Sequence, residues 1–131
     1  MPPTLDHIGI AVRSLEAVKI YEDLGLTTEH VEVVESQGVK TAFLSVGDSH
    51  IELLEPTGHD SPVGRFIEKR GEGVHHLCFR VADIDRELER LERKGYRLIH
   101  RNPVPGSRGS RVAFLHPSAA SGVLIELTER P

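Results

Sequence analysis

Two stretches of the chain share one order of hydrophobic and polar positions. They are residues 5–26 (LDHIGIAVRSLEAVKIYEDLGL) and residues 74–98 (VHHLCFRVADIDRELERLERKGYRL). Each begins with an apolar run typical of a β-strand, passes a polar break and continues with apolar residues at helical spacing. The repeated pattern predicts a strand followed by a helix in each half of the chain.

The ends of the two predicted helices carry matching signals. Ser14 and Asp83 stand at the polar breaks as N-caps, and Gly25 and Gly95 stand where the helical spacing stops. The apolar positions that favour a helix are Leu15, Val18, Ile20 and Tyr21 in the first copy and Ile84, Leu88 and Leu91 in the second.

Further strand-like segments follow each helix. The turn residues 47–49 and 117–122 separate pairs of these segments in the manner of antiparallel hairpins. The predicted strands are residues 31–34, 40–46 and 50–56 in the first half and residues 97–104, 111–117 and 122–129 in the second.

The pattern as a whole predicts an α+β fold made of two βαβββ modules. Module one covers about residues 4–56, and module two covers about residues 73–129. A connector of about residues 57–72 lies between them and contains a short predicted helix, Pro62 to Lys69, with proline at an early helical position.

The composition excludes several classes of function. Sixteen basic and twenty acidic residues give a net charge of −4, whereas a protein that binds nucleic acid through its phosphates usually has an excess of positive charge. No apolar stretch approaches the ~20 residues that cross a bilayer, and MPPTLDH has neither region of a signal peptide. The single Cys78 excludes an intramolecular disulfide and a thiolate-rich zinc site. We expect one cytoplasmic domain, residues 1–131, without nucleic-acid or membrane partners.

Four side chains recur at equivalent places in the two modules. His7 and His76 lie on the first strand of each module, and Glu52 and Glu126 lie on the last. If the modules pack with pseudo-twofold symmetry, all four converge, and two imidazoles with two carboxylates suit a divalent metal ion. Taken singly, such a histidine is more often hydrogen-bonded at a surface, but a carboxylate in an apolar strand needs a partner.

The other histidines and the cysteine are assigned structural roles. His75 faces away from His76, Cys78 is read as a small buried side chain, and the loop Gly106 to Ser110 as an ordinary loop or an anion site. His116 is a loop residue near the last predicted hairpin, and contact with a substrate is the alternative to a structural role. His50 stands two positions before Glu52, which would place it on the same face, but at a strand start we expect it to be exposed. We expect His30, His59 and His100 to be solvated.

Four segments, in this order, resemble the vicinal oxygen chelate superfamily and, within it, the methylmalonyl-CoA epimerase family. They are DHIGIAV (6–12), HIELLEP (50–56), DSPVGRFIEKRGEGVHHLCFRV (60–81) and VAFLHPSAASGVLIELTE (112–129). The resemblance implies paired modules that form a curved, open-barrel mixed sheet around a central metal.

The resemblance also implies an activity and its residues. His7, Glu52, His76 and Glu126 match the metal ligands, with cobalt foremost and nickel, manganese, zinc or magnesium as further candidates. The implied reaction interconverts (2R)- and (2S)-methylmalonyl-CoA through a metal-stabilised enolate, with Glu126 and Glu52 as the catalytic carboxylates. Thr41 stands where some members have a second glutamate base, so Glu35 or a water molecule is the alternative there.

The resemblance implies a homodimer, and the sequence leaves other activities open. A glyoxalase I would use the same four ligands on a glutathione adduct, and an Fe(II) oxygenase could use His7, His76 and Glu126. A metal-free small-molecule-binding protein of this fold is the alternative outside enzymes.

Overall fold

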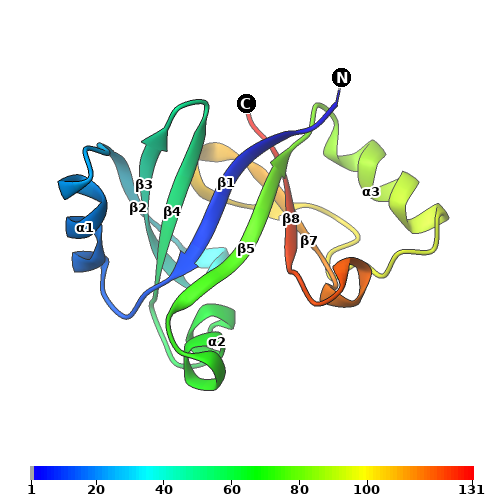
Figure 1. Cartoon of the computed structure of the whole chain (residues 1–131). Helices are drawn as coiled ribbons and strands as arrows, with labels where there is room; N and C mark the ends of the chain where they lie inside the picture. Colours follow the sequence, from blue (N-terminus) through cyan, green and yellow to red (C-terminus); the bar gives the residue numbers. More distant parts are fainter. Residues whose placement is uncertain (1) are drawn as a thin grey trace. The chain divides into compact units, whose positions relative to one another are not determined.

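The computed structural model describes residues 2–131, which divide into two compact units (Figure 1). The first unit is residues 7–75, and the second unit is residues 2–6 together with residues 76–131. No helix among residues 2–131 is long and apolar enough to span a membrane.

The strands of module one are ordered β2-β3-β4-β1. β1 and β4 are parallel, whereas the β2–β3 and β3–β4 pairs are antiparallel. The short 3₁₀ helix η1 and helix α1 connect β1 to β2, and η2 connects β2 to β3. The bounds are β1 Thr4–Ala11, η1 Leu15–Ala17, α1 Val18–Asp23, β2 Thr28–Val34, η2 Glu35–Gln37, β3 Val39–Val46 and β4 Ser49–Pro56.

Module two repeats this order as β5-β8-β7-β6. β5 and β8 are parallel, and the β7–β8 and β6–β7 pairs are antiparallel. The bounds are β5 Gly73–Arg80, α3 Ile84–Arg93, β6 Val104–Pro105, η3 Ser107–Gly109, β7 Arg111–Leu115, η4 Pro117–Ala120 and β8 Ile125–Glu129. Helix α2, Pro62–Arg70, lies between the modules in the sequence. The two predicted βαβββ modules and the connector helix are confirmed.

The strand predicted over residues 97–104 is wrong for most of its length. Leu98 forms a single bridge to Leu115, and regular pairing resumes only in the two-residue strand β6. Pro103 and Pro105 stand on either side of Val104 and have no backbone N–H to donate. They therefore interrupt the ladder of hydrogen bonds around β6.

Helix α1 buries only part of its predicted apolar face. Leu15, Val18 and Tyr21 pack against Leu53 and its neighbours, whereas Ile20 is 58% exposed. Leu15, Val18 and Tyr21 follow one another at every third position and face the sheet, whereas Ile20 lies outside this spacing and points away. Helix α3 follows its pattern, since Ile84 and Leu88 are both buried against β7 and β8.

The N-caps are confirmed, and a second helix-capping device repeats in both modules. The side chains of Ser14 and Asp83 accept hydrogen bonds from the first turns of η1 and α3. Glu55, on β4, accepts a hydrogen bond from the backbone N–H of Leu15 (2.9 Å). Glu129, on β8, accepts the equivalent bond from Ile84 (3.0 Å). Each strand thereby satisfies a backbone donor that the helix itself cannot use.

We expect Glu55→Ala to lower the free energy of unfolding by about 1–2 kcal/mol, because the Leu15 N–H loses a charged acceptor. Urea denaturation measures this loss. Glu89→Ala is the matched control, since Glu89 is 70% exposed at its side chain and lies 3.8 Å from Arg93. An equal effect of both substitutions would contradict a capping role for Glu55.

Candidate functional site

The first unit brings His7 and Glu52 together. His7 Nε2 lies 3.0 Å from the Glu52 carboxylate, and the two side chains are only 3% and 6% exposed. The parallel pairing of β1 with β4 places Gly9 opposite Glu52, two residues beyond His7. Phe43 lies opposite Glu52 on β3, and its ring meets the His7 ring edge to face at 5.6 Å.

The second unit repeats this arrangement with His76 and Glu126. His76 Nε2 lies 3.0 Å from the Glu126 carboxylate, and both side chains are buried. Phe114 lies opposite Glu126 on β7, and its ring meets the His76 ring edge to face at 5.5 Å. Each unit therefore contains a His–Phe–Glu set of the same design.

The chemistry of these buried side chains fits a metal ligand set. His7, Glu52, His76 and Glu126 are all buried, and each offers one nitrogen or oxygen donor to a cation. Neutral imidazoles and carboxylates are the ligands that borderline divalent ions accept. Removing carboxylates from water is costly unless a cation, proton or donor compensates them, which is consistent with a site built for an ion.

A second histidine stands beside the aromatic ring in the first unit. The His50 ring contacts Phe43 edge to face at 5.8 Å, and His50 Nε2 lies 3.4 Å from Glu29. Because side chains two apart on a strand share a face, His50 faces the same side of β4 as Glu52. His50 is half-buried, so the expectation that it is solvated was only partly met.

His100 takes a fixed position in the second unit, contrary to the expectation of a solvated loop residue. Its backbone N–H donates to the Phe114 carbonyl (3.2 Å), and its Nδ1 accepts the Phe114 backbone N–H (3.0 Å). Partial burial lowers the pKa of His100, and the nearby charge of Glu126 opposes that shift. The Phe114 bond fixes the proton of the neutral ring on Nε2.

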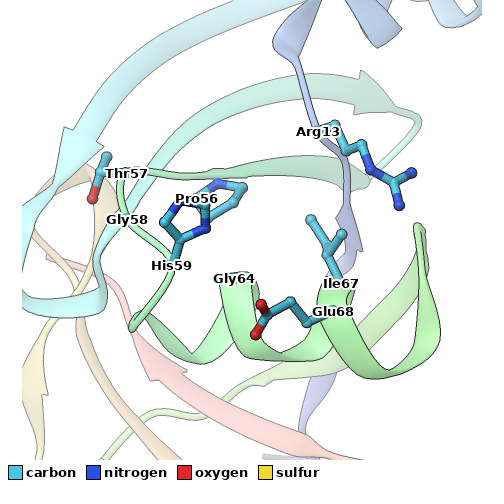
Figure 2. A pocket seen from close by; sticks show the side chains of 8 residues that line it. All are labelled: Arg13, Pro56, Thr57, Gly58, His59, Gly64, Ile67 and Glu68. Carbon is cyan, nitrogen blue, oxygen red and sulfur yellow. The ribbon is translucent and has the colours of Figure 1, made fainter.

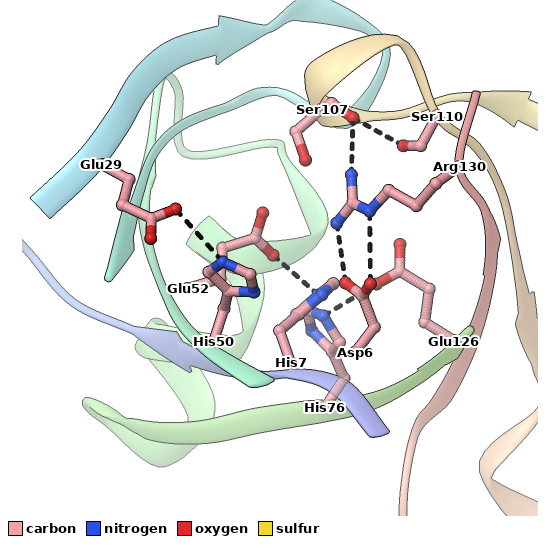
Figure 3. A network of polar contacts seen from close by, with 10 residues as sticks. All are labelled: Asp6, His7, Glu29, His50, Glu52, His76, Ser107, Ser110, Glu126 and Arg130. Carbon is pink, nitrogen blue, oxygen red and sulfur yellow. Dashed lines mark hydrogen bonds and ion pairs between the residues drawn. The ribbon is translucent and has the colours of Figure 1, made fainter. Parts of the chain in front are cut away.

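A buried ion pair in the second unit connects Asp6, on β1, to Arg130, which directly follows β8. Arg130 donates to both carboxylate oxygens of Asp6, and its third contact is the backbone carbonyl of Ser107 (Figure 3). The Ser110 hydroxyl donates to the same carbonyl at 2.6 Å. The loop of η3 is therefore held from two sides.

The first unit also contains an open pocket of about 560 Å³ beside α2. Arg13, His59 and Glu68 line it with polar groups, and Ile67 adds an apolar wall (Figure 2). Neither His7 nor Glu52 lines this pocket. The Arg13 guanidinium lies 3.3 Å from Glu72, so the arginine is already paired.

The remaining candidates have structural surroundings. The His75 ring packs edge to face on Phe66 at 5.0 Å, and Cys78 is fully buried, as expected. His116 caps η4 by accepting the Ser118 N–H. Its role beside a substrate stays a prediction. Glu35 is the exposed first residue of η2, and Thr41 is buried on β3.

Two phenylalanines and the contacts of Arg130 were not predicted from the sequence. Phe43 and Phe114 each stand in the tripeptide AFL, in KTAFLSV and RVAFLHP, so the repeat carried a signal for them. Asp6 and Arg130 lie 124 residues apart, and no spacing rule connects them.

Comparison with known proteins identifies similar chains over the full length. Residues 6–114 match the model of the Glyoxalase/Bleomycin resistance protein/Dioxygenase superfamily. Protein YqjC of Bacillus subtilis is 45% identical over 95% of this chain and 91% of its own. The mitochondrial methylmalonyl-CoA epimerase of Dictyostelium discoideum is 38% identical over 96% of this chain and 78% of its own.

Solved structures are equally similar. A methylmalonyl-CoA epimerase in complex with methylmalonyl-CoA and an ammonium ion has a TM-score of 0.93 and 43% identity, covering 99% of this chain and 96% of that one. A Streptomyces coelicolor methylmalonyl-CoA epimerase with a serine-to-threonine substitution has a TM-score of 0.92 and 44% identity, covering 97% of this chain and 94% of that one. That variant was solved with 2-nitronate-propionyl-CoA, as were glutamate and glutamine variants of the same enzyme.

The lowered pKa of His100 predicts a pH dependence of stability. Below the ordinary histidine pKa, the unfolded chain binds this proton more readily than the folded one, so folding loses stability as the pH falls. We expect His100→Asn, whose side-chain oxygen can still accept the Phe114 N–H, to lose less stability than the wild type between pH 7 and pH 5.

Urea denaturation across this range measures the difference. His59→Asn is the control, because His59 is an exposed histidine outside the helices and strands. Parallel stability curves for the wild type and His100→Asn would contradict the prediction.

Proposed function

Because the chain belongs to the glyoxalase/bleomycin resistance protein/dioxygenase superfamily, we propose that it is a metal-dependent epimerase that interconverts (2R)- and (2S)-methylmalonyl-CoA. The observation that carries this proposal is the buried His–Glu pair present in each unit. The similarity to methylmalonyl-CoA epimerases at 38–43% identity over nearly the whole chain supports this substrate.

The two pairs would act as one ligand set in a single domain. His7 and Glu52 would supply half of the ligands, and His76 and Glu126 the other half, for one divalent ion, with cobalt the first metal to test and nickel, manganese, zinc and magnesium the next. Such an ion supplies Lewis-acid stabilisation of negative charge on the acyl oxygens of the substrate. The His–Phe contacts hold each imidazole ring in a fixed orientation, which a ligand requires.

The reaction needs a group that removes the proton from C2 and a group that returns one to the opposite face. Glu126 and Glu52 are carboxylates within the proposed ligand set and are the first candidates. A carboxylate that coordinates a cation is a weaker base than a free one. A further carboxylate outside the ligand set would therefore accept or return the C2 proton more readily. Glu35 is the candidate for that role, because Thr41 stands where some members of the family have a second glutamate base and Glu35 lies outside the ligand set.

The spacing of two substituted positions in the Streptomyces coelicolor enzyme adds Ser107 to the proposed site. In that enzyme the replaced serine follows the replaced glutamine by 55 residues. Glu52 and Ser107 have the same separation in this chain. We assign the buried Ser107 hydroxyl as a donor to an acyl oxygen.

In the proposed reaction, one glutamate removes the proton from C2. The electron pair of the broken C–H bond then moves toward the thioester carbonyl. A proton is then delivered to C2 from the other face, which inverts the centre and leaves the substrate's composition unchanged. A homodimer and a cytoplasmic location stay predictions that accompany this proposal, to be tested by light scattering and by cell fractionation.

The direct test measures deuterium incorporation at C2 of methylmalonyl-CoA in heavy water, with a chiral assay of the product. We expect metal-replete protein to exchange the proton and invert the centre, and chelated protein to do neither. Inert methylmalonyl-CoA in the presence of bound metal would reject the proposal. The glutathione hemithioacetal would then test the glyoxalase alternative.

Two glutamine substitutions separate the bases from the ligands. We expect Glu35→Gln to keep the bound metal and to lower kcat by about 10²–10⁴-fold, because it removes one proton-transfer group. We expect Glu126→Gln to lower both the metal content and kcat, since it removes a ligand charge as well. Metal analysis and exchange kinetics measure both, and Glu89→Gln on the exposed face of α3 is the control. Full activity in Glu35→Gln would contradict its assignment as a base.

A further inference from the structure

One carbonyl oxygen in the second unit accepts three hydrogen bonds. The Ser107 carbonyl receives the Ser110 hydroxyl at 2.6 Å, the Ser110 backbone N–H at 3.1 Å and the Arg130 guanidinium at 3.2 Å. In the reverse direction, the Gly106 N–H donates to the Ser110 carbonyl at 3.0 Å. The loop Gly106 to Ser110 is thus closed on itself and attached to Arg130.

The backbone of this loop has a conformation that the surrounding contacts must maintain. Arg108 has φ 56° and ψ 36°, a left-handed conformation that is unfavourable for a residue with a side chain. A Cβ on Gly106 would lie 2.6 Å from the Val112 side chain and 2.7 Å from the Ser110 hydroxyl oxygen. Strained residues persist where the structure fixes them, and they concentrate at functional sites. The loop therefore has one defined shape, unlike an ordinary mobile loop.

Arg130 connects this loop to the start of β1. Its Nε and one terminal nitrogen lie 3.2 Å and 2.7 Å from the two carboxylate oxygens of Asp6, a two-point contact that fixes the guanidinium plane. The side chains of Arg130 and Asp6 are only 10% and 7% exposed. The third contact is then directed at the Ser107 carbonyl, which leaves the guanidinium little freedom to move (Figure 3).

Stability alone is a poor reason for such a pair. Desolvation of two charges offsets much of their attraction, and apolar residues of similar size are often as stabilising in the same position. The charged pair fixes the geometry of its contacts, because the planar guanidinium donates hydrogen bonds only along fixed directions. The geometry that it defines here is that of the loop carrying Ser107.

We propose that Arg130 is a positioning residue for catalysis, which holds Ser107 in place by joining the Ser107 carbonyl to the Asp6 carboxylate. The inference rests on the proposed function, in which the Ser107 hydroxyl donates to an acyl oxygen of the substrate. Asp6 directly precedes His7, so the same guanidinium also restrains the backbone next to a proposed metal ligand. Arg130 itself touches no reacting atom in this account.

The test is a double-mutant cycle between Arg130→Lys and Ser107→Ala. A lysine ammonium keeps the charge beside Asp6 but cannot hold both carboxylate oxygens and the Ser107 carbonyl in one plane. We expect Arg130→Lys to lower kcat about tenfold with a change in KM below threefold, because a donor to developing charge acts in the transition state. In the Ser107→Ala background, the same substitution should lower kcat by less than twofold.

Thermal unfolding separates positioning from simple stabilisation. If Arg130 only stabilises the fold, Arg130→Lys lowers the Tm and changes kcat by the same factor in the wild type and in Ser107→Ala. That result would overturn the proposal. An unchanged kcat in Arg130→Lys also overturns it. Arg93→Lys is the matched control, since Arg93 is 71% exposed on α3. Its kcat is expected to equal that of the wild type.

A second variant covers the case in which Arg130→Lys does not fold. Asp6→Asn keeps the size of the side chain and weakens its hold on Arg130, and amide hydrogen exchange at Ser110 then measures the loop directly. We expect faster exchange at Ser110 together with a lower kcat, whereas unchanged exchange would contradict the connection. Hydrogen exchange at Ser110 is measured without substrate, so it tests the loop contact independently of the activity. A wild-type protein that is inert toward methylmalonyl-CoA would reject the proposed function and leave the exchange result unaffected.

Discussion

Each unit buries a glutamate against a histidine, and the strands around the pair are arranged to keep both side chains out of water. A carboxylate with 6–8% of its side chain exposed has lost most of its water, and this loss is tolerated only with a partner that offsets the charge. An imidazole nitrogen at 3.0 Å gives each carboxylate one partner. A divalent cation would satisfy both groups more completely, because imidazole and carboxylate can both donate to it.

The repeat gives each unit the same means of holding its pair. Parallel pairing of the first and last strands brings histidine and glutamate together, and a phenylalanine on the neighbouring strand supports the histidine ring. The same last strand carries a second glutamate three positions later, which caps the helix on the other face of the sheet. One strand thus supplies both a candidate ligand and a structural contact, because its side chains alternate in direction.

Much of the fold could be predicted because its signals are local. Strand and helix periodicity, the N-caps Ser14 and Asp83, and the equivalent positions of the four histidine and glutamate residues all follow from short stretches of sequence. The errors arise where tertiary contacts decide. The strand expected over residues 97–104 is reduced to one bridge and two paired residues, and His100 is held by the backbone of Phe114, a residue 14 positions away in the sequence. The Asp6–Arg130 pair depends on a contact across 124 residues, which no local pattern encodes.

The metal stoichiometry of the purified protein, with the ligands identified by X-ray absorption, decides whether the two pairs bind one ion. We expect one divalent ion per chain with two imidazole nitrogens in its coordination sphere. We also expect Glu52→Ala and Glu126→Ala each to remove most of the bound ion, because both pairs serve one ion. Two ions per chain, or loss of only half of the metal in each variant, would show that the pairs act separately and would contradict the account.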